Sequence, residues 1–263
     1  MNIANQYNHL NAREFLIVNK MPEYNEILDS IAQIDANQFL KISCDAAKLG
    51  QVFYSQTRIN AALKKLLKGC GWRERKVSYY VTGDEQTTRD IISILDGAQQ
   101  KQIIESRGHE SYSTFNQVDF QKARIAVEAQ FGKYFSVAYD LHVKHTFFYS
   151  RNDIDVGIEI IPTKAMEMHM DTGVPWFENE VTNVIREGRT NPPVPILMLG
   201  VEPENICSRE PEDYGDVELA QFLRQSDINK LRSQIVKVKA GRMGAAVQKR
   251  ITRMEHCFAA MGI

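Results

Sequence analysis

The sequence lacks several features that would place it in a specialised class. It has no apolar run of membrane-spanning length and no basic-then-apolar leader after Met1, so we expect a cytoplasmic protein. Its four cysteines lie far apart without C-x-x-C spacing, which argues against a zinc site or a disulfide framework. The formal net charge of -1 argues against a protein that coats nucleic acid without specificity, because such proteins carry a basic excess.

The charge composition changes near Pro203. Residues 204–223 carry six acidic side chains against one basic one, whereas residues 224–263 carry nine basic side chains against two acidic ones. We therefore predict a main domain over residues 1–203 and a helical C-terminal extension over residues 204–263. The extension is either a pair of amphipathic helices docked on the core or an additional phosphate-binding surface.

Apolar periodicity predicts an α/β fold. The first seventy residues look mostly helical, and a strand is expected at 72–81. Further helices are predicted at 87–95, 99–107, 134–149 and 176–187, and further strands at 124–131, 154–161 and 194–201. Alternation of strands and helices predicts a central mixed sheet with helices on both faces. His142 and His145 in the helix 134–149 are interpreted as packing or hydrogen-bonding residues, because no Cys or third His accompanies them.

One segment places polar groups where a buried strand should be apolar. In the strand 124–131, Glu128 and Gln130 lie on the face opposite Ile125 and Val127. A carboxylate among apolar residues is unfavourable unless a partner compensates it, and a hard divalent cation is a suitable partner for clustered carboxylates. Asp119, just before this strand, is a natural second carboxylate. The alternative is a solvent-facing Glu and Gln on an edge strand, and the spacing alone does not distinguish the two.

This segment also carries a resemblance to a known family. Asp119, Glu128-Ala129-Gln130 and the following Phe131-Gly132-Lys133-Tyr134 resemble the active-site segment of the BglII/BstYI family of type II restriction endonucleases. The resemblance includes Ile-Asp-Val-Gly-Ile-Glu-Ile at 154–160 and Asn-Val-Ile-Arg-Glu-Gly-Arg at 183–189, extends over about residues 1–203, and is closest to the BstYI branch. Residues 204–263 have no counterpart in it.

The resemblance implies the PD-(D/E)xK restriction-endonuclease-like fold and a catalytic site made of Asp119, Glu128 and Gln130. It implies that Mg²⁺ is bound by Asp119, Glu128 and the backbone carbonyl of Ala129. Gln130 stands where the wider superfamily has lysine, as in this family itself, and would orient the attacking water because it cannot accept a proton at neutral pH. The implied reaction is hydrolysis of duplex DNA to 5′-phosphate and 3′-hydroxyl ends.

The resemblance also implies partners. Restriction enzymes of this kind are homodimers, because a two-fold symmetric protein matches a palindromic site. The implied site is a short palindrome containing GATC. A companion DNA methyltransferase is expected in the bacterial or archaeal host, because the unmodified host DNA would otherwise be cut.

Several residues are candidates for DNA contact. Lys133 and the turn beginning Asp171-Thr172 would read bases in the major groove, or are solvated loop residues. Arg186 and Arg189 would bind phosphate, or form ion pairs with glutamates of the same helix.

Two other functions stay open at the level of sequence. The first is a nuclease of the same fold with a repair or structure-selective role, which would give a smear or require branched DNA. The second is a DNA-binding protein without catalysis, in which the acids are structural and Mg²⁺ brings no gain in stability or DNA binding.

Overall fold

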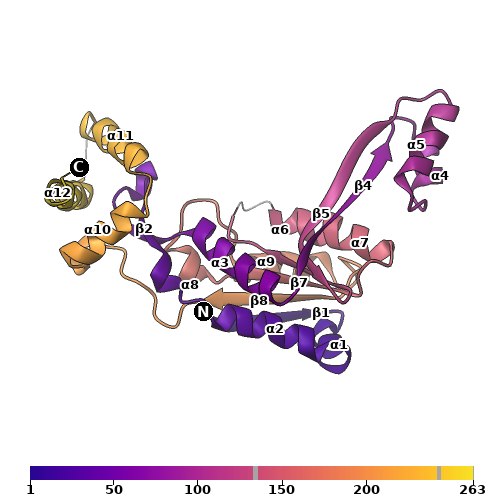
Figure 1. The fold of residues 1–263 in the computed structure, drawn as a ribbon, viewed down its shortest axis with the longest axis horizontal. Helices are drawn as coiled ribbons and strands as arrows, with labels where there is room; N and C mark the ends of the chain where they lie inside the picture. Colours follow the sequence, from indigo (N-terminus) through magenta and orange to yellow (C-terminus); the bar gives the residue numbers. More distant parts are fainter. Residues whose placement is uncertain (133–135, 242–243, 263) are drawn as a thin grey trace.

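The structure is a computed structural model that describes residues 1–132, 136–241 and 244–262. Its centre is a six-stranded sheet with the order β1-β8-β7-β6-β5-β4 (Figure 1). The strands are β1 (Asn2–His9), β4 (Arg73–Val81), β5 (Tyr112–Lys122), β6 (Ile125–Ala129), β7 (Val156–Pro162) and β8 (Ile196–Glu202). β6, β7 and β8 are parallel, and the other pairs are antiparallel. The predicted α/β fold with a central mixed sheet is confirmed.

Helices cover both faces of this sheet. One face carries α1 (Ala12–Asn19), α2 (Met21–Ala32) and α3 (Gln56–Gly69); the other carries α6 (Ser136–Tyr139), the π-helical turn η3 (Asp140–His145), α7 (Thr146–Ser150) and α9 (Phe177–Glu187). Leu16 and Leu63 pack in one buried cluster with Ile158 of β7. Val184 packs in another buried cluster with Ile161 of β7. The side chains of β7 therefore point to both faces of the sheet. Burial on both faces explains why β7 is almost continuously apolar.

The first seventy residues contain more strand than predicted. β1 is an edge strand that pairs antiparallel with β8, and β2 (Leu40–Ile42) pairs with β3 (Val52–Tyr54) in a separate hairpin. The mostly polar sequence of β1 gives no strand signal of its own. It forms because the backbone groups of β8 need partners along that edge, a requirement that the local sequence does not show.

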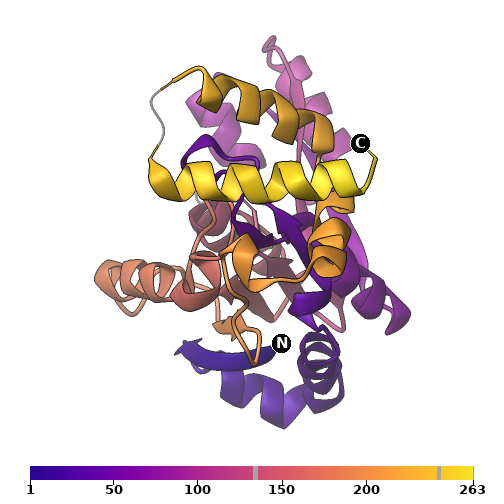
Figure 2. The same cartoon turned by 90° about the vertical axis from the view of Figure 1, so that its left-hand side faces the viewer.

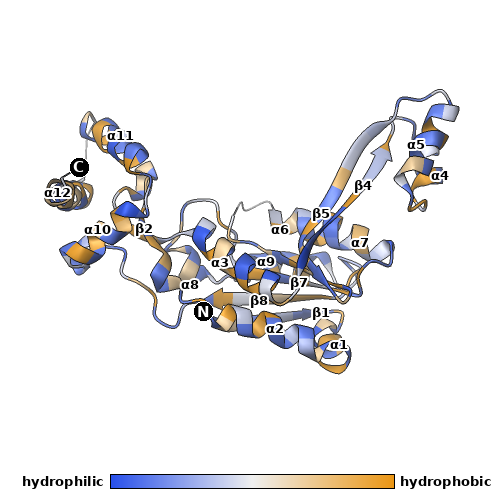
Figure 3. Cartoon of the chain, in the orientation of Figure 1, coloured by the Kyte–Doolittle hydropathy of each residue, from blue (hydrophilic) through white to orange (hydrophobic). Residues whose placement is uncertain are grey.

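Two projections lie at opposite ends of the long axis of the molecule (Figure 1). The β4–β5 ribbon carries α4 (Glu85–Ile91) and α5 (Gly97–Ser106) at one end. The extension forms α10 (Asp216–Arg224), α11 (Ile228–Lys239) and α12 (Ala245–Ala260) at the other end, where α11 and α12 lie in front in Figure 2. In Figure 3, α11 shows both hydrophilic and hydrophobic residues, as expected of an amphipathic helix.

Short elements complete the description. They are α8 (Lys164–Glu167) and the 3₁₀ helices η1 (Ala36–Phe39), η2 (Ala46–Lys48) and η4 (Pro211–Asp213). Within the described ranges, no helix has the length and apolar character needed to cross a bilayer. The four cysteines are free thiols.

Candidate active site

The hairpin that joins β5 to β6 brings two acids together. Ala123 and Arg124 form its two-residue turn, and both have positive φ, 46° and 65°. Arg124 is held in this conformation by Asp155, whose Oδ1 accepts from Nη2 at 2.7 Å. The turn sets the register of Phe120 opposite Val127, so Asp119 and Glu128 occupy the next positions along the two strands.

Asp119 lies inside β5, whereas the sequence placed it just before the active strand without predicting a strand there. A β-bulge occurs at this point, because the register with β4 shifts by one residue between Arg73 and Arg75. As a result Val118 and Phe120, which would share a face in a regular strand, belong to different buried clusters. The half-buried Asp119 lines a hollow with Tyr139 and Lys144, and bulges commonly re-aim side chains in this way near active sites.

Glu128 and Gln130 form a buried polar layer with a third residue, Glu159. The exposed fractions are 2 % for Glu128, 5 % for Gln130 and 0 % for Glu159. Glu159 lies on β7 directly beside Glu128 in the parallel register. Glu128 and Gln130 both reach the helical segment 136–150, which agrees with the predicted alternation and excludes the alternative of a solvent-facing pair on an edge strand.

The π-helical turn η3 supplies the partners of this layer. Lys144 Nζ lies 3.1 Å from Glu128 Oε1 and 2.7 Å from Asp140 Oδ1. The side-chain amide of Gln130 donates to Asp140 Oδ2. His145 Nε2 lies 2.8 Å from Glu159 Oε1. A π turn brings residues five apart onto one side, so η3 presents its acid, its lysine and its histidine to the sheet together.

The site holds more negative than positive groups. Burial, then the neighbouring carboxylates of Asp119 and Asp140, raise the pKa of Glu128. Burial also raises the pKa of Asp140, against the opposing contacts from Lys144 and Gln130. Burial by itself would lower the pKa of Lys144. The carboxyl groups of Glu128 and Asp140 raise this pKa by more than burial lowers it, so the Lys144 side chain is a charged ammonium. One ammonium therefore faces several carboxyl groups.

His145 and Glu159 form a neutral pair. Burial, with the charge of Lys144 in addition, lowers the pKa of His145 to about 3. Burial, then Asp140 and Glu128, raise the pKa of Glu159. The other histidine of this segment, His142, lies 2.9 Å from Glu187 through its Nε2. His145 is thus a hydrogen-bonding residue, as interpreted from the sequence, and His142 is in contact with Glu187.

This pair makes stability depend on pH. In the unfolded chain Glu159 loses its proton near pH 4.5 and His145 near 6.5, whereas burial in the folded protein raises the pKa of Glu159 and lowers that of His145, which favours one proton on the pair, held by Glu159. The contribution of the pair to the free energy of unfolding is therefore constant between pH 4.5 and pH 6.5, and it falls as the pH rises above 6.5. We expect Glu159→Gln to gain stability relative to wild type as the pH rises, by up to about 1.4 kcal/mol per pH unit. Urea unfolding of wild type and Glu159→Gln at pH 5.5 and pH 8 measures this gain. If the two proteins differ in free energy of unfolding by the same amount at both pH values, the pair is not neutral.

The His145 ring occupies space that is free only because Gly157 in β7 has no side chain. A Cβ built at Gly157 would lie 2.7 Å from His145 Nδ1 and 2.8 Å from Cε1. We expect Gly157→Ala to lower the free energy of unfolding by about 2 kcal/mol through overpacking, measured by urea unfolding. Gly83→Ala is the control, because nothing lies within 4 Å of the Cβ built there. Equal stability of both variants would show that the ring can move aside.

The donors suit a hard divalent cation. In the described ranges no group of three or more His, Cys, Asp or Glu side chains is arranged to hold a metal. Mg²⁺ does not need such a cage, since it commonly keeps several waters and uses one or two carboxylates together with substrate phosphate. Asp119 lines the hollow, and Glu128 lies behind it in contact with Lys144, so the site offers two carboxylates whose negative charge is incompletely balanced. The residues therefore fit the ion that the sequence predicts.

The candidate DNA contacts lie outside this layer. Asp171 pairs with Lys41, and the hydroxyl of Thr172 donates to Asp45. Arg186 and Arg189 form no ion pair in the part of the chain that the structure describes, so the predicted alternative of helix-end ion pairs is not observed. Lys133 lies outside the described residues.

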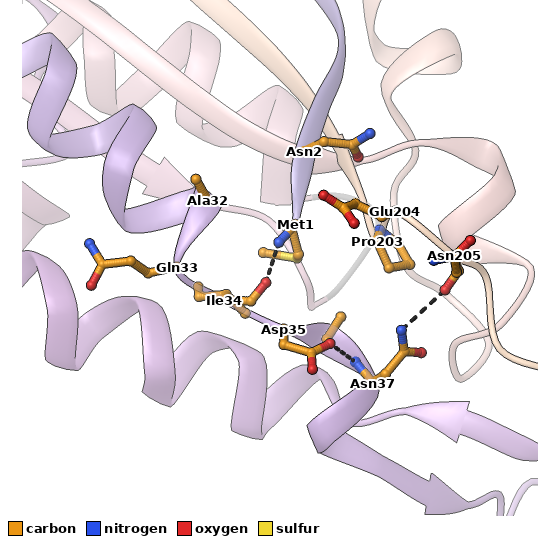
Figure 4. Close-up of a pocket in the computed structure, with 11 residues that line it drawn as sticks. Met1, Asn2, Ala32, Gln33, Ile34, Asp35, Asn37, Pro203, Glu204 and Asn205 are labelled. Atoms are coloured by element: carbon orange, nitrogen blue, oxygen red, sulfur yellow. Dashed lines mark hydrogen bonds between the residues drawn. The ribbon is translucent and has the colours of Figure 1, made fainter.

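A separate hollow lies between the start of β1 and the end of α2 (Figure 4). The amino group of Met1 donates to the Ile34 carbonyl, and Asp35 accepts from the Asn37 backbone at 3.1 Å. Asn37 in turn donates to the Asn205 carbonyl at 3.2 Å. The polar groups of this hollow join distant segments of the chain to one another, and none of the predicted site residues lines the hollow.

Comparison with known proteins decides the family. The family model described as restriction endonuclease BglII/BglIII matches residues 4–201, well over half of the chain. The chain belongs to the BglII/BglIII restriction endonuclease family. It is accordingly a type II, site-specific deoxyribonuclease that binds duplex DNA, and enzymes of this family generally use a divalent metal ion. No curated protein matches the chain.

A solved structure supports the fold. The crystal structure of BglII complexed with a DNA 16-mer is similar at a TM-score of 0.55 and 18 % identity, covering 79 % of this chain and 81 % of that chain. The structure of free BglII is similar at a TM-score of 0.49 and 16 % identity, covering 79 % and 82 %. At 18 % identity the likeness to the DNA complex shows the fold alone, and the restriction-endonuclease fold predicted from the sequence is confirmed.

In this restriction endonuclease the prediction from the sequence missed Glu159 of the buried layer and two partners of that layer, Asp140 and Lys144. Glu159 gave the same signal as Glu128, a single acid inside an apolar strand, but was not selected. Asp140 and Lys144 have the i, i+4 spacing of a helical ion pair, which on its own indicates an ordinary surface contact. Their role follows only from their contact with Glu128 and Gln130.

Proposed function

We propose that this restriction endonuclease is a Mg²⁺-dependent homodimer that cuts a short palindrome containing GATC and leaves 5′-phosphate ends. The observation that carries the proposal is the acidic layer of Asp119 and Glu128, placed on neighbouring strands beside Gln130 at the end of β6. We place the enzyme in the cytoplasm of a bacterium or archaeon that carries a companion methyltransferase.

The metal ligands in this proposal are Asp119, Glu128 and the backbone carbonyl of Ala129. Mg²⁺ bound there would lower the pKa of a bound water and neutralise the scissile phosphate. Gln130 donates its amide to Asp140, which leaves its carbonyl oxygen to accept a hydrogen bond from the attacking water. Gln130 therefore orients the water without taking its proton.

Lys144 supplies the positive charge that Gln130 lacks. Its ammonium reaches Glu128 from η3, not from the active strand. The side chain is 21 % exposed and lines the hollow beside Asp119. From there it balances the buried carboxylates, and on substrate binding its ammonium is within reach of a phosphate oxygen in the same hollow.

Digestion of a long, fully sequenced, unmethylated duplex with Mg²⁺, followed by sequencing of fragment ends, tests the proposal. Discrete ends that share one palindrome containing GATC are expected. A palindrome without GATC would correct the site alone. A smear, or cleavage of branched DNA only, would favour a repair or structure-selective nuclease, and absence of cleavage with tight DNA binding would favour a non-catalytic protein.

A further inference from the structure

Two adjoining hollows connect the end of the active strand to the C-terminal extension. The first is lined by Phe131 and Gly132, which directly follow Gln130, and by the turn 171–174. The second shares Thr57, Asp171 and Thr172 with the first. We call the continuous surface of the two hollows the side groove.

The extension forms one wall of the side groove. Gln225, Ser226, Asp227 and Lys230, from the end of α10 and the start of α11, line the second hollow, whose volume is about 570 Å³. Arg58 of α3 lines the same hollow from the main domain. The part of the chain that lies beyond the family match therefore completes a surface that begins at the residues directly after Gln130.

The position of this wall is fixed by packing. The backbone amide of Ile42 donates to Ser226 Oγ at 2.7 Å, which joins β2 to the end of α10. Arg250 of α12 lies 2.8 Å from Glu210, joining the last helix to the loop after β8. Leu223 and Met254 are fully buried in the same cluster as the residues of the main sheet. The extension is thus packed against the main domain by hydrogen bonds, an ion pair and buried apolar side chains.

The side groove presents both donors and acceptors. Lys41, Arg58 and Lys230 face Asp45, Asp171 and Asp227 in the second hollow, so its formal charges balance. A balanced groove is a poor phosphate site, because phosphate binding depends on excess positive charge. Base edges, in contrast, offer both donors and acceptors in the major groove. The mixed chemistry therefore fits base pairs better than backbone phosphates.

Unpartnered polar atoms point to an absent ligand. In the described part of the chain, Arg58 Nη1, Asn60 Oδ1 and Gln225 Oε1 are buried without a hydrogen-bond partner, and all three residues line the side groove. Lys230 forms no ion pair among the described residues, whereas Lys41 pairs with Asp171. Buried polar atoms are normally paired, so a cluster of exceptions in one groove indicates partners supplied by a bound molecule.

We infer that the extension reads base pairs of the duplex next to the cleavage site, through Gln225 and Lys230. This inference rests on the proposed cleavage at Glu128, because the side groove is placed on DNA by its continuity with the active strand. It gives the extension a specificity role and makes the recognised sequence longer than the palindrome read by the main domain alone.

Binding measurements on Gln225→Ala and Lys230→Ala test the inference. The specific duplex carries the sequence that the wild-type enzyme cuts together with the flanking bases most enriched at cut ends, and the non-specific duplex has the same length. In metal-free buffer each variant is expected to bind the specific duplex about tenfold more weakly and the non-specific duplex within about twofold of wild type. Lys237→Ala is the matched control, an exposed lysine on the same helix that does not line the side groove.

The outcomes separate this inference from the proposed function. Equal losses on both duplexes, with a weaker salt dependence, would show phosphate contact and overturn base reading. Unchanged binding to both would overturn the role of the side groove while leaving cleavage at Glu128 intact. If the wild-type enzyme instead makes no specific cut, the proposed function fails before these variants are compared.

Discussion

Glu128→Gln is expected to lower the single-turnover rate of duplex cleavage by more than about 10³-fold. The substitution removes one of the two carboxylates proposed to hold the metal, and it does so at a side chain that is only 2 % exposed. The variant should fold as wild type does. Burial disfavours the charged form of Glu128 and raises its pKa, and the neutral amide of Gln has no charge to bury. Affinity for the duplex in metal-free buffer should stay within a few-fold of wild type, since Glu128 does not line the hollow that contains Asp171 and Thr172, two of the candidate DNA contacts.

The matched control is Glu85→Gln, an exposed glutamate at the start of α4 on the β4–β5 ribbon. It should cleave at the wild-type rate. Cleavage by Glu128→Gln at a rate similar to that of this control would remove Glu128 from the active site, even if the enzyme proved to be Mg²⁺-dependent.

Lys144→Met is expected to lower the free energy of unfolding by about 3 kcal/mol at pH 8, because it leaves the buried carboxyls of Glu128 and Asp140 without their cation. Cleavage should fall as well, since the proposed charge beside the phosphate is lost. Mg²⁺ should restore more stability to this variant than to wild type, because the ion would then be the remaining positive group at the carboxylates. Urea unfolding with and without Mg²⁺ measures both effects.

Lys101→Met serves as the comparison, because Lys101 forms an exposed helical pair, 3.7 Å from Glu105, and its ammonium lies 5.8 Å from the centre of the Tyr80 ring. Its stability should change by less than about 0.5 kcal/mol, with no added response to Mg²⁺. A Lys144 variant that loses stability but responds to Mg²⁺ as wild type does would have a structural role alone.

The centre of the site could be predicted because a parallel strand buried on both faces is almost wholly apolar. Glu128 in β6 and Gln130 directly after it therefore stand out, and their alternation shows that they share a face. The same reasoning applied to β7 would have selected Glu159, whose neighbours Ile158 and Ile160 are buried aliphatic residues.

The remaining geometry depends on contacts between distant segments. The bulge that turns Asp119 toward the site arises from its pairing with β4, which no local pattern shows. Lys144 reaches Glu128 because η3 is a π turn, and the sequence expectation was only a buried helix. The edge strand β1 is likewise polar and forms on the template of β8. The periodicity of a sequence indicates which residues of one helix or strand are buried. It does not indicate which residues of a distant helix or strand contact them.

The most direct test of the metal site is the Mg²⁺ dependence of single-turnover cleavage by wild type and Asp119→Asn on the same duplex. We predict no cleavage by wild type in EDTA, a saturable rise with Mg²⁺, and for Asp119→Asn a rate that stays near zero or saturates only at much higher Mg²⁺. Cleavage by wild type in EDTA, or an Asp119→Asn variant with an unchanged rate and an unchanged Mg²⁺ midpoint, would contradict the account of this site.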